Sequence, residues 1–403
     1  MTEKLYYSDP SMMEFDARAV SVVERDGKCH AVLDRTCFYP GGGGQPCDTG
    51  TIAGVRVEET LPRDDEIVHV LSGPISEGAV HGVVDAEHRR DFMTQHTGEH
   101  VFAQALLRAG GLHTVSVHFG DDDTTIEVKA DAVAPRVLRD AEDIANAAIR
   151  DNHRVVVHEI DRSELPRFAL RRTPPDAQRL RIVEVGDYDR VACSGVHVST
   201  TSELFLVKAA WQEKIRGNTR IHLMIGRRAF DDYGRKIALV QDLEKLLTCG
   251  EPFIRDRVQE LMTRERETGR ELKRLQLARA SVDADEAVAA GKTVKGAVIV
   301  KRVLSDAGPD YVKAFVERVT ATPGRLVIAI DRVGDGFQWT VAHSLADTFS
   351  LAAFLPALLP AADARGGGKP ARMQGSGRSV AAADRFADAI EGAATVALEQ
   401  EAL

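Results

Sequence analysis

The segment DFMTQHTGEHVFAQALLRAG, residues 91–110, marks a change in the character of the chain. Its apolar residues recur near the 3.6-residue period of an α-helix, and Gly110 with Gly111 supplies a stop signal at its end. The segment therefore predicts an amphipathic helix. His96 and His100 lie on it at positions i and i+4, so their imidazole rings are expected to project from one face.

The residues before this helix alternate short β-rich runs with turn residues. Runs such as RAVSVVE, HAVLD, VRVEET and EIVHVL follow one another between residues 15 and 90, and no long helical period interrupts them. The pattern predicts a small barrel or sandwich, so a β-barrel-like domain is expected over residues 1–90. The glycine run at 41–44 on its own indicates a flexible turn.

The residues after the helix divide into three further parts. Alternating strands and helices predict an α+β domain over residues 91–230. Residues 231–283, rich in Leu, Glu, Arg and Lys at helical spacing, predict a helical hairpin or coiled coil that could join two copies in a homodimer. Residues 284–403 alternate strand-like and helix-like runs around a glycine-rich loop, which predicts a C-terminal α/β domain. The fold class expected for the whole chain is α+β.

Composition and charge narrow the classes of function. The 403 residues carry a formal net charge of -9, which argues against a protein coated in basic surface. A nucleic-acid partner must therefore be held by local basic patches. The N-terminus has no secretory signal, and the longest apolar run, residues 351–362, is shorter than the roughly 20 residues that span a bilayer. We expect a cytoplasmic protein with no membrane partner, and the odd number of five cysteines favours a reducing compartment.

The sequence CSGVH at residues 193–197 strengthens the prediction that the two histidines on the helix bind a metal ion. His96 and His100 alone are a weak signal, but Cys193 and His197 add a thiol and a third imidazole. Such a nitrogen and sulfur set suits zinc. Four protein ligands would close the metal's shell, whereas three would leave a position for water, and the residues alone leave both arrangements open. The motif is not the HExxH of metalloproteases.

Several segments carry a resemblance to a known family. The chain resembles the editing domains of alanyl-tRNA synthetases and their free-standing relatives, called AlaX. Four segments carry this resemblance: FYPGGGGQPCDTG (38–50), QHTGEH (95–100), RIVEVGDYDRVACSGVHVS (181–199) and KIRGNTRI (214–221). GGGKPARMQGSG (366–377) resembles the glycine-rich signature of the C-terminal domain, of the DHHA1 type, in the synthetase and in the long AlaX class. Because no aminoacylation domain precedes residue 1, the resemblance implies a free-standing editing protein.

The resemblance implies an enzyme that hydrolyses the aminoacyl ester of tRNA(Ala) wrongly charged with serine, or with glycine, and that uses a zinc ion. A synthetase pocket built for a methyl side chain distinguishes these amino acids by little binding energy, so a second site must sort the products. Two alternatives stay open: an RNA-binding protein with a structural zinc and no hydrolysis, and editing of another aminoacyl-tRNA such as threonyl-tRNA.

The resemblance also implies roles for individual residues. His96, His100, Cys193 and His197 match the zinc-binding positions, although a water in place of His197 stays open. The expected catalytic residues are Gln45, in the family's GGQ loop, and Thr114 and Ser116, whose hydroxyls would face a serine-sensing pocket. The expected substrate contacts are Gly43, Gly44 and His118. The family usually shows CGGTH, so Ser194 and Val196 depart from its pattern, and the loss of the threonine hydroxyl could change a hydrogen bond near the metal.

Basic residues suggest where tRNA would bind. Arg365, Lys369 and Arg372 lie in the glycine-rich loop of the C-terminal domain with no acidic residue among them, and a glycine-rich loop can follow a phosphate backbone. Further arginines could guide the acceptor end towards the editing site: Arg171, Arg172, Arg216, Arg220, Arg227 and Arg228.

Overall fold

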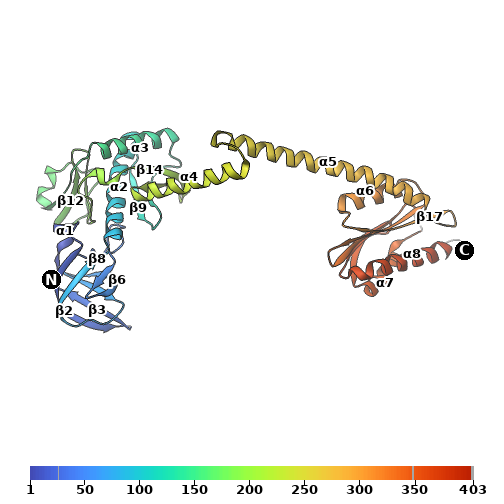
Figure 1. Ribbon diagram of the computed structural model, residues 1–403, viewed down its shortest axis with the longest axis horizontal. Helices are drawn as coiled ribbons and strands as arrows, with labels where there is room; N and C mark the ends of the chain where they lie inside the picture. The colour runs from blue at the N-terminus through green and yellow to red at the C-terminus, as the bar shows by residue number, and fades with distance from the viewer. Residues whose placement is uncertain (26, 347–348, 401–403) are drawn as a thin grey trace. The chain divides into compact units, whose positions relative to one another are not determined.

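The computed structural model describes residues 1–25, 27–346 and 349–400 (Figure 1). The chain divides into two compact units, Met1–Leu243 and Glu244–Leu403. Both units combine helices with strands, so the predicted mixed α+β class is confirmed. No helix in the described ranges is long and apolar enough to cross a membrane.

The first unit begins with a closed barrel. Its strands follow the order β2 (Glu14–Arg25), β3 (Lys28–Leu33), β7 (Glu66–Leu71), β6 (Val55–Arg63), β5 (Gly50–Ile52) and β8 (Gly78–Val84). Strand β8 buries alternate residues, whereas β7 is buried almost throughout, and Leu33, Phe38 and Leu71 are fully buried inside. Three short elements belong to the same part of the chain: helix α1 (Leu5–Ser8) and the strands β1 (Glu3–Lys4) and β4 (Arg35–Thr36), which pair in parallel.

The helix predicted over residues 91–110 is part of a longer one. Helix α2 (Ala86–Gly110) begins earlier because the Asp85 side chain accepts hydrogen bonds from the backbone N–H groups of Glu87 and His88. It ends where Gly111 adopts a left-handed conformation with φ of 64°. The helix runs from the barrel to α3 (Figure 1). The start of the helix is set by the carboxylate of Asp85, which precedes the first turn, so the pattern of apolar residues alone missed this start.

Two sheets surround α2. One has the strand order β14 (Val207–Ile215), β15 (Asn218–Ile225), β10 (Thr124–Val128) and β9 (Thr114–Phe119), and the other has the order β11 (Val155–Asp161), β12 (Arg179–Val185) and β13 (Asp189–Ala192). Helix α3 (Pro135–Arg150) and the 3-10 helices η1 (Arg162–Arg167) and η2 (Thr201–Leu204) complete this region. Phe102, Leu106 and Ile221 are fully buried in the core shared by helix and sheet. That core fixes α2 against the segment that follows β13.

Two long helices follow in sequence. Helix α4 (Arg227–Leu247) contains the boundary between the two units, and α5 (Ile254–Ala289) belongs to the second unit. The chain leaves helical conformation at Thr248, whose φ is 52°, and the 3-10 helix η3 (Glu251–Phe253) precedes α5.

The second unit is built on one six-stranded sheet. Its order is β16 (Lys292–Val294), β17 (Ala297–Ser305), β18 (Arg325–Val333), β19 (Gly336–His343), β21 (Arg372–Gly377) and β20 (Ala364–Lys369). Helix α6 (Pro309–Thr320) packs on one face with α5, and α7 (Leu355–Leu358) and α8 (Ala383–Gln400) pack on the other (Figure 1). Short 3-10 helices connect these elements: η4 (Leu351–Ala353), η5 (Pro360–Ala362) and η6 (Val380–Ala382).

The glycine-rich segment of this unit is a β-hairpin, and its prediction as a loop is wrong. Strands β20 and β21 pair antiparallel from Ala364 with Gly377 to Lys369 with Arg372. Glycine is needed here because a Cβ atom on Gly366 would lie 2.4 Å from the Trp339 ring and 2.3 Å from a backbone oxygen of the partner strand. The glycines therefore permit close strand packing over a buried indole, a cause that composition does not reveal.

Candidate metal centre

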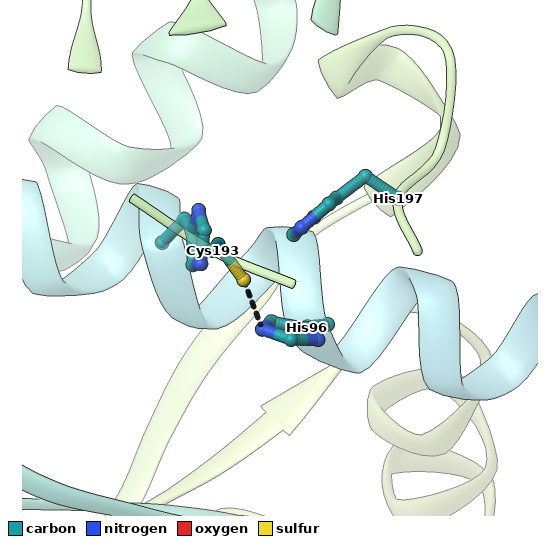
Figure 2. Close-up of side chains that lie close together, drawn as sticks. His96, Cys193 and His197 are labelled. Atoms are coloured by element: carbon teal, nitrogen blue, oxygen red, sulfur yellow. Dashed lines mark hydrogen bonds between the residues drawn. The ribbon is translucent and has the colours of Figure 1, made fainter. Parts of the chain in front are cut away.

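Four side chains converge beside α2. The donor atoms that His96, His100, Cys193 and His197 can offer all lie within 4.8 Å of one another. Figure 2 shows the His96 ring joined to Cys193 by a dashed line, with His197 pointing towards them from its loop. The three histidines are buried and Cys193 is partly buried. The structure thus brings together the four residues that the sequence predicts as a metal-binding set.

Two local structures create this convergence. His96 and His100 occupy successive turns of α2, and the CSGVH segment starts directly after β13, where the backbone N–H of Cys193 donates to the Arg181 carbonyl at 2.9 Å. The loop then passes directly over the His96 ring. A Cβ atom on Gly195 would lie only 2.1 Å from Cε1 of that ring, so this position requires glycine.

The barrel contributes Gln45. Its Oε1 atom accepts hydrogen bonds from Nδ1 of His96 at 2.8 Å and from the backbone N–H of Val196 at 3.3 Å. Nε2 of His96 then faces Sγ of Cys193 at 3.2 Å. The four glycines before Gln45 all have positive φ, and Gly42 and Gln45 exchange two backbone hydrogen bonds of 3.0 Å. The predicted turn is therefore a tight one that aims the Gln45 amide at the metal-binding helix.

His197 and His100 retain unpartnered nitrogens. Nδ1 of His197 lies 3.1 Å from Oγ1 of Thr97, whereas its buried Nε2 has no hydrogen-bond partner among the described residues. Nδ1 of His100 is also buried and unpartnered within those residues. A buried polar atom without a partner is costly, and a metal ion would supply the missing interaction. Tetrahedral zinc with bonds of about 2.0–2.3 Å needs donor atoms roughly 3.3–3.8 Å apart, so the donor set fits zinc after small shifts.

The environment keeps the imidazoles neutral. Burial, followed by the charges of Arg181 and Arg172, lowers the pKa of His96 to about 3. Burial also places the pKa values of His100 and His197 well below the usual range. Neutral imidazole is the form that binds metal. Burial raises the pKa of Cys193 to about 11, so this side chain stays a thiol until a cation stabilises the thiolate.

Arg181 and Tyr7 hold the CSGVH loop from outside. Nη1 of Arg181 donates to the carbonyl of Gly195 and lies 3.4 Å from that of Cys193, while the Tyr7 hydroxyl donates to the Ser194 carbonyl at 3.2 Å. The Arg181 guanidinium also stacks 4.4 Å above the Tyr7 ring. Sequence reasoning missed both residues, and it missed the contact from Thr97 to His197. Only Arg181 had a sequence signal, because it belongs to the β-rich run that leads into Cys193.

A cleft of about 490 Å³ is lined by three of the four donors, His96, His100 and Cys193. Gly43, Gly44 and Ser116 line it, together with Glu99, which lies beside His100 on α2. Burial raises the pKa of Glu99. Two other predicted residues are not in the lining of this cleft. Thr114 is partly buried at the start of β9, and His118 is exposed near its end.

The two departures from the family motif have different surroundings. The Val196 side chain is fully buried in the hydrophobic core, and only its backbone N–H reaches Gln45. A methyl group thus occupies an apolar environment at the position where the family has threonine. Ser194 lies in the lining of the cleft.

The predicted tRNA-binding residues lie on the β20–β21 hairpin. Arg365 and Lys369 are exposed on β20, and Arg372 is partly buried on β21. Lys369 stands directly opposite Arg372, and Arg365 is four residues from Lys369 on the same strand. Paired residues and alternate residues share a face of a sheet, so the three cations share one face.

Comparisons with known proteins extend these observations. No family model matches the chain. The chain is 31% identical over 404 residues to an alanine–tRNA ligase of Methanoculleus marisnigri, covering 97% of this chain and 43% of that protein. It is 35% identical over 240 residues to the alanyl-tRNA editing protein AlaX-L of Pyrococcus horikoshii, covering 57% of this chain and 59% of that protein. The chain thus spans about half the length of the curated relatives it matches.

Among solved structures, the C-Ala domain of the Aquifex aeolicus alanyl-tRNA synthetase matches 27% of this chain and 96% of that domain, with 18% identity and a TM-score of 0.24. The sequence similarity to the two relatives does not depend on this likeness. The chain is a homologue of the alanine–tRNA ligases and of the alanyl-tRNA editing protein AlaX-L, as the motifs around His96 and Cys193 predict.

Proposed function

We propose that the chain is an aminoacyl-tRNA hydrolase that removes serine, or glycine, wrongly attached to tRNA(Ala). The observation that carries this proposal is the convergence of His96, His100, Cys193 and His197 beside a cleft of about 490 Å³ in a homologue of an alanyl-tRNA editing protein. Cavities of roughly 300–1,000 Å³ hold small organic ligands, so the cleft has room for an aminoacylated nucleoside.

The reaction is hydrolysis of an ester. The oxygen of a water molecule forms a bond to the acyl carbon, the bond from that carbon to the ribose oxygen breaks, and the ribose hydroxyl receives a proton. Selectivity is the harder task, because serine and alanine differ by one hydroxyl. A site that hydrogen-bonds the seryl hydroxyl spares alanine, whose binding would leave buried polar groups unpaired.

The four donors would hold a zinc ion. When bound, zinc supplies a Lewis acid that can polarise a carbonyl group or lower the pKa of water. Gln45 orients the ring of His96 through Nδ1, so that Nε2 faces the cluster. Gly43 and Gly44 let the backbone approach the acyl group closely, since no side chain projects there.

The serine-sensing role is assigned to hydroxyls on β9. Ser116, in the lining of the cleft, is the foremost candidate for hydrogen bonding to the seryl side chain. Thr114 and His118 keep their proposed roles as second contacts, and they would reach substrate only if the aminoacylated end extends along β9.

The partner proposed is tRNA(Ala). The shared face of Arg365, Lys369 and Arg372 supports binding of its phosphate backbone by the second unit. We propose the same division of labour as the sequence predicts: residues 1–90 supply the GGQ loop, 91–230 the editing site, 231–283 a helical linker and possible dimer surface, and 284–403 the tRNA-binding domain. The cytoplasm, where tRNA is charged, is the proposed compartment.

A second candidate function follows from the number of donors. Four protein ligands close a tetrahedral shell, which is the usual arrangement of structural zinc sites. On that observation the chain would bind RNA without hydrolysing it. Metal content does not separate the two candidates, because both require zinc.

The decisive experiment is deacylation of tRNA(Ala) charged with serine, glycine or alanine, with zinc measured on the same protein sample. Release of serine or glycine with alanine spared, at about one zinc per chain, supports the editing function. Tightly bound zinc with no release from any of the three supports the structural alternative. Threonyl-tRNA(Thr) serves as a fourth substrate, and its preferential hydrolysis would transfer the specificity to another editing system.

A further inference from the structure

Six arginines of the first unit, Arg172, Arg179 and four that carry ion pairs, fall into two groups. In the first group each guanidinium is held by an acidic side chain of the same unit: Arg171 by Asp189 at 3.1 Å, Arg220 by Glu127 at 2.7 Å, Arg227 by Asp231 at 2.8 Å and Arg228 by Asp91 at 2.6 Å. These ion pairs satisfy the cations within the protein. They leave little charge to attract a ligand.

Arg172 and Arg179 form the second group. Both side chains are exposed, and neither makes a hydrogen bond or an ion pair with any residue that the structure describes. Both line the cleft beside the four metal-binding donors. Arg181 lines it too, but its Nη1 atom is committed to the CSGVH loop and its guanidinium is stacked on Tyr7.

The charge of the cleft is uneven. Glu99 is the one acidic residue in its described lining. Apart from the arginines and the donors His96, His100 and Cys193, the wall contains glycine, serine and apolar side chains. A chain with a net charge of -9 thus presents local positive charge next to its candidate metal centre. Asp161 stands opposite Arg179 in the pairing of β11 with β12, yet no ion pair joins them among the described residues.

The loop that carries Arg172 is anchored on both sides. Before it, the backbone N–H of Arg171 donates to the Arg190 carbonyl at 2.9 Å, and the Arg171 ion pair with Asp189 is almost fully buried. After it, Nη1 of Arg162 donates to the Pro175 carbonyl at 3.0 Å. Arg179 is likewise fixed, as the first residue of β12. The two cations are therefore presented from ordered backbone, which reduces the entropy lost when they bind a ligand.

We propose that Arg172 and Arg179 form a phosphate-binding subsite for the terminal nucleotides of the tRNA acceptor end. This inference rests on the proposed function of the cleft and deepens it. An aminoacylated nucleoside carries no phosphate charge of its own, so the nearest anions in the substrate are the phosphates that link it to the preceding nucleotides. Planar guanidinium groups bind phosphate oxygens through paired charge-assisted hydrogen bonds. The cleft then recognises an aminoacyl ester by its attachment to an oligonucleotide.

Binding of an uncharged oligonucleotide tests the subsite without any need for hydrolysis. The probe is a fluorescent hairpin of the tRNA(Ala) acceptor stem ending in single-stranded CCA, titrated with full-length protein over a range of salt concentrations. The variants are Arg172→Gln, Arg179→Gln and the double substitution, with Arg172→Lys and Arg179→Lys as conservative replacements. Arg150→Gln is the matched control, because Arg150 is exposed on α3, has no ion pair within the described residues and lies outside the cleft lining.

We expect each glutamine substitution to weaken binding roughly tenfold, the scale of a lost hydrogen bond between charged groups. The double variant should also flatten the salt dependence, because each single-strand phosphate contact contributes about 0.7 to the slope of log K against log salt. Lysine should restore part of the affinity, since it keeps the charge but loses the paired geometry. Zinc content and melting temperature should equal those of the wild type. A double variant with wild-type affinity and salt slope would overturn the subsite.

Two substrates separate failure of the subsite from failure of the proposed function. Serylated hairpin hydrolysed by the double variant with a raised KM supports both proposals, whereas hydrolysis with an unchanged KM overturns the subsite alone. Arginine-dependent hairpin binding with no hydrolysis of any substrate supports the subsite and overturns the hydrolase. Seryl ethyl ester, which has no phosphate, should show no difference in rate between wild type and double variant, and an equal loss on both substrates would assign the arginines a structural role instead.

Discussion

The Nδ1 atom of His96 lies 2.8 Å from the Oε1 atom of Gln45, and this contact joins the barrel to the helix that carries the candidate metal centre. Oε1 can only accept a hydrogen bond, so Nδ1 of His96 carries the proton and Nε2 keeps its lone pair. That lone pair faces Sγ of Cys193. One amide from the first ninety residues thereby sets the tautomer of a predicted zinc ligand.

Replacing Gln45 with alanine should weaken zinc binding by about 10- to 100-fold, the effect typical of removing a partner of a metal-binding histidine. The fold should survive, because Gln45→Ala removes only two hydrogen bonds, to Nδ1 of His96 and to the backbone N–H of Val196. Competition with a chromogenic chelator measures the affinity. Gln241→Ala, at an exposed position of α4, is the matched control, and equal affinities for the two variants would show that the Gln45 contact does not support the metal.

Cys193→Ala should abolish zinc retention and deacylation together. The substitution removes the only thiol of the four-donor set. This thiol loses its proton and becomes a metal-binding thiolate when a cation stabilises the charge. Zinc per chain after dialysis and the rate of serine release are the two measurements. Cys249→Ala, a partly buried cysteine of the second unit, should leave both unchanged. Wild-type deacylation by a zinc-free Cys193 variant would overturn the role of the metal.

His69 should make the stability of the barrel depend on pH. Burial lowers its pKa to about 4 from an ordinary value of 6.5, although the Ala31 carbonyl opposes the shift. Between these two pH values the unfolded chain therefore binds the proton of His69 more readily than the folded chain. The contribution of neutral, buried His69 to the free energy of unfolding is complete above pH 6.5 and is lost as pH falls towards 4. The shift corresponds to about 3 kcal/mol in the free energy of unfolding.

Denaturant unfolding of the protein at pH 7.5 and pH 5 measures this contribution. His69→Asn should have a smaller difference between the two pH values, because the titrating group is gone, even though its absolute stability falls with the loss of the contact to Thr36. His30→Asn is the matched control, because it removes a partly buried histidine from the neighbouring strand β3 of the same barrel. Equal pH dependence in the wild type and His69→Asn would exclude His69 as the source.

Replacing Arg365, Lys369 and Arg372 together with glutamine should weaken binding of full-length tRNA(Ala) and flatten its salt dependence. Each lost contact to duplex phosphate is expected to reduce the slope of log K against log salt by about 0.9. Filter binding at several salt concentrations measures both quantities. Arg385→Gln, at an exposed position of α8, should leave the slope unchanged. If the triple variant keeps the wild-type slope, the β20–β21 hairpin lies outside the interface.

The mixed fold was largely predictable because its signals are local. A helical period over residues 91–110 predicts the body of α2, and the same period places His96 and His100 on one face. The start of α2 depends instead on the Asp85 cap, which carries no apolar periodicity. The β20–β21 hairpin escaped prediction because its glycine-rich composition is typical of loops. Its strands are held instead by the pairing of β21 with β19 and with β20, and by close packing over Trp339.

The sequence by itself determined which side chains could bind zinc, since a thiol and three imidazoles are an unusual donor set whatever surrounds them. Only the tertiary structure decided what holds those donors in place. Gln45 and His96 are 51 residues apart, and Tyr7 meets Ser194 across 187 residues. Contacts at such separations follow from how the barrel, α2 and β12 pack together, and no local period or motif spacing encodes them. The packing also gives two neighbouring arginines different surroundings: Arg171 forms an ion pair with Asp189, whereas Arg172 lines the cleft without a partner among the described residues.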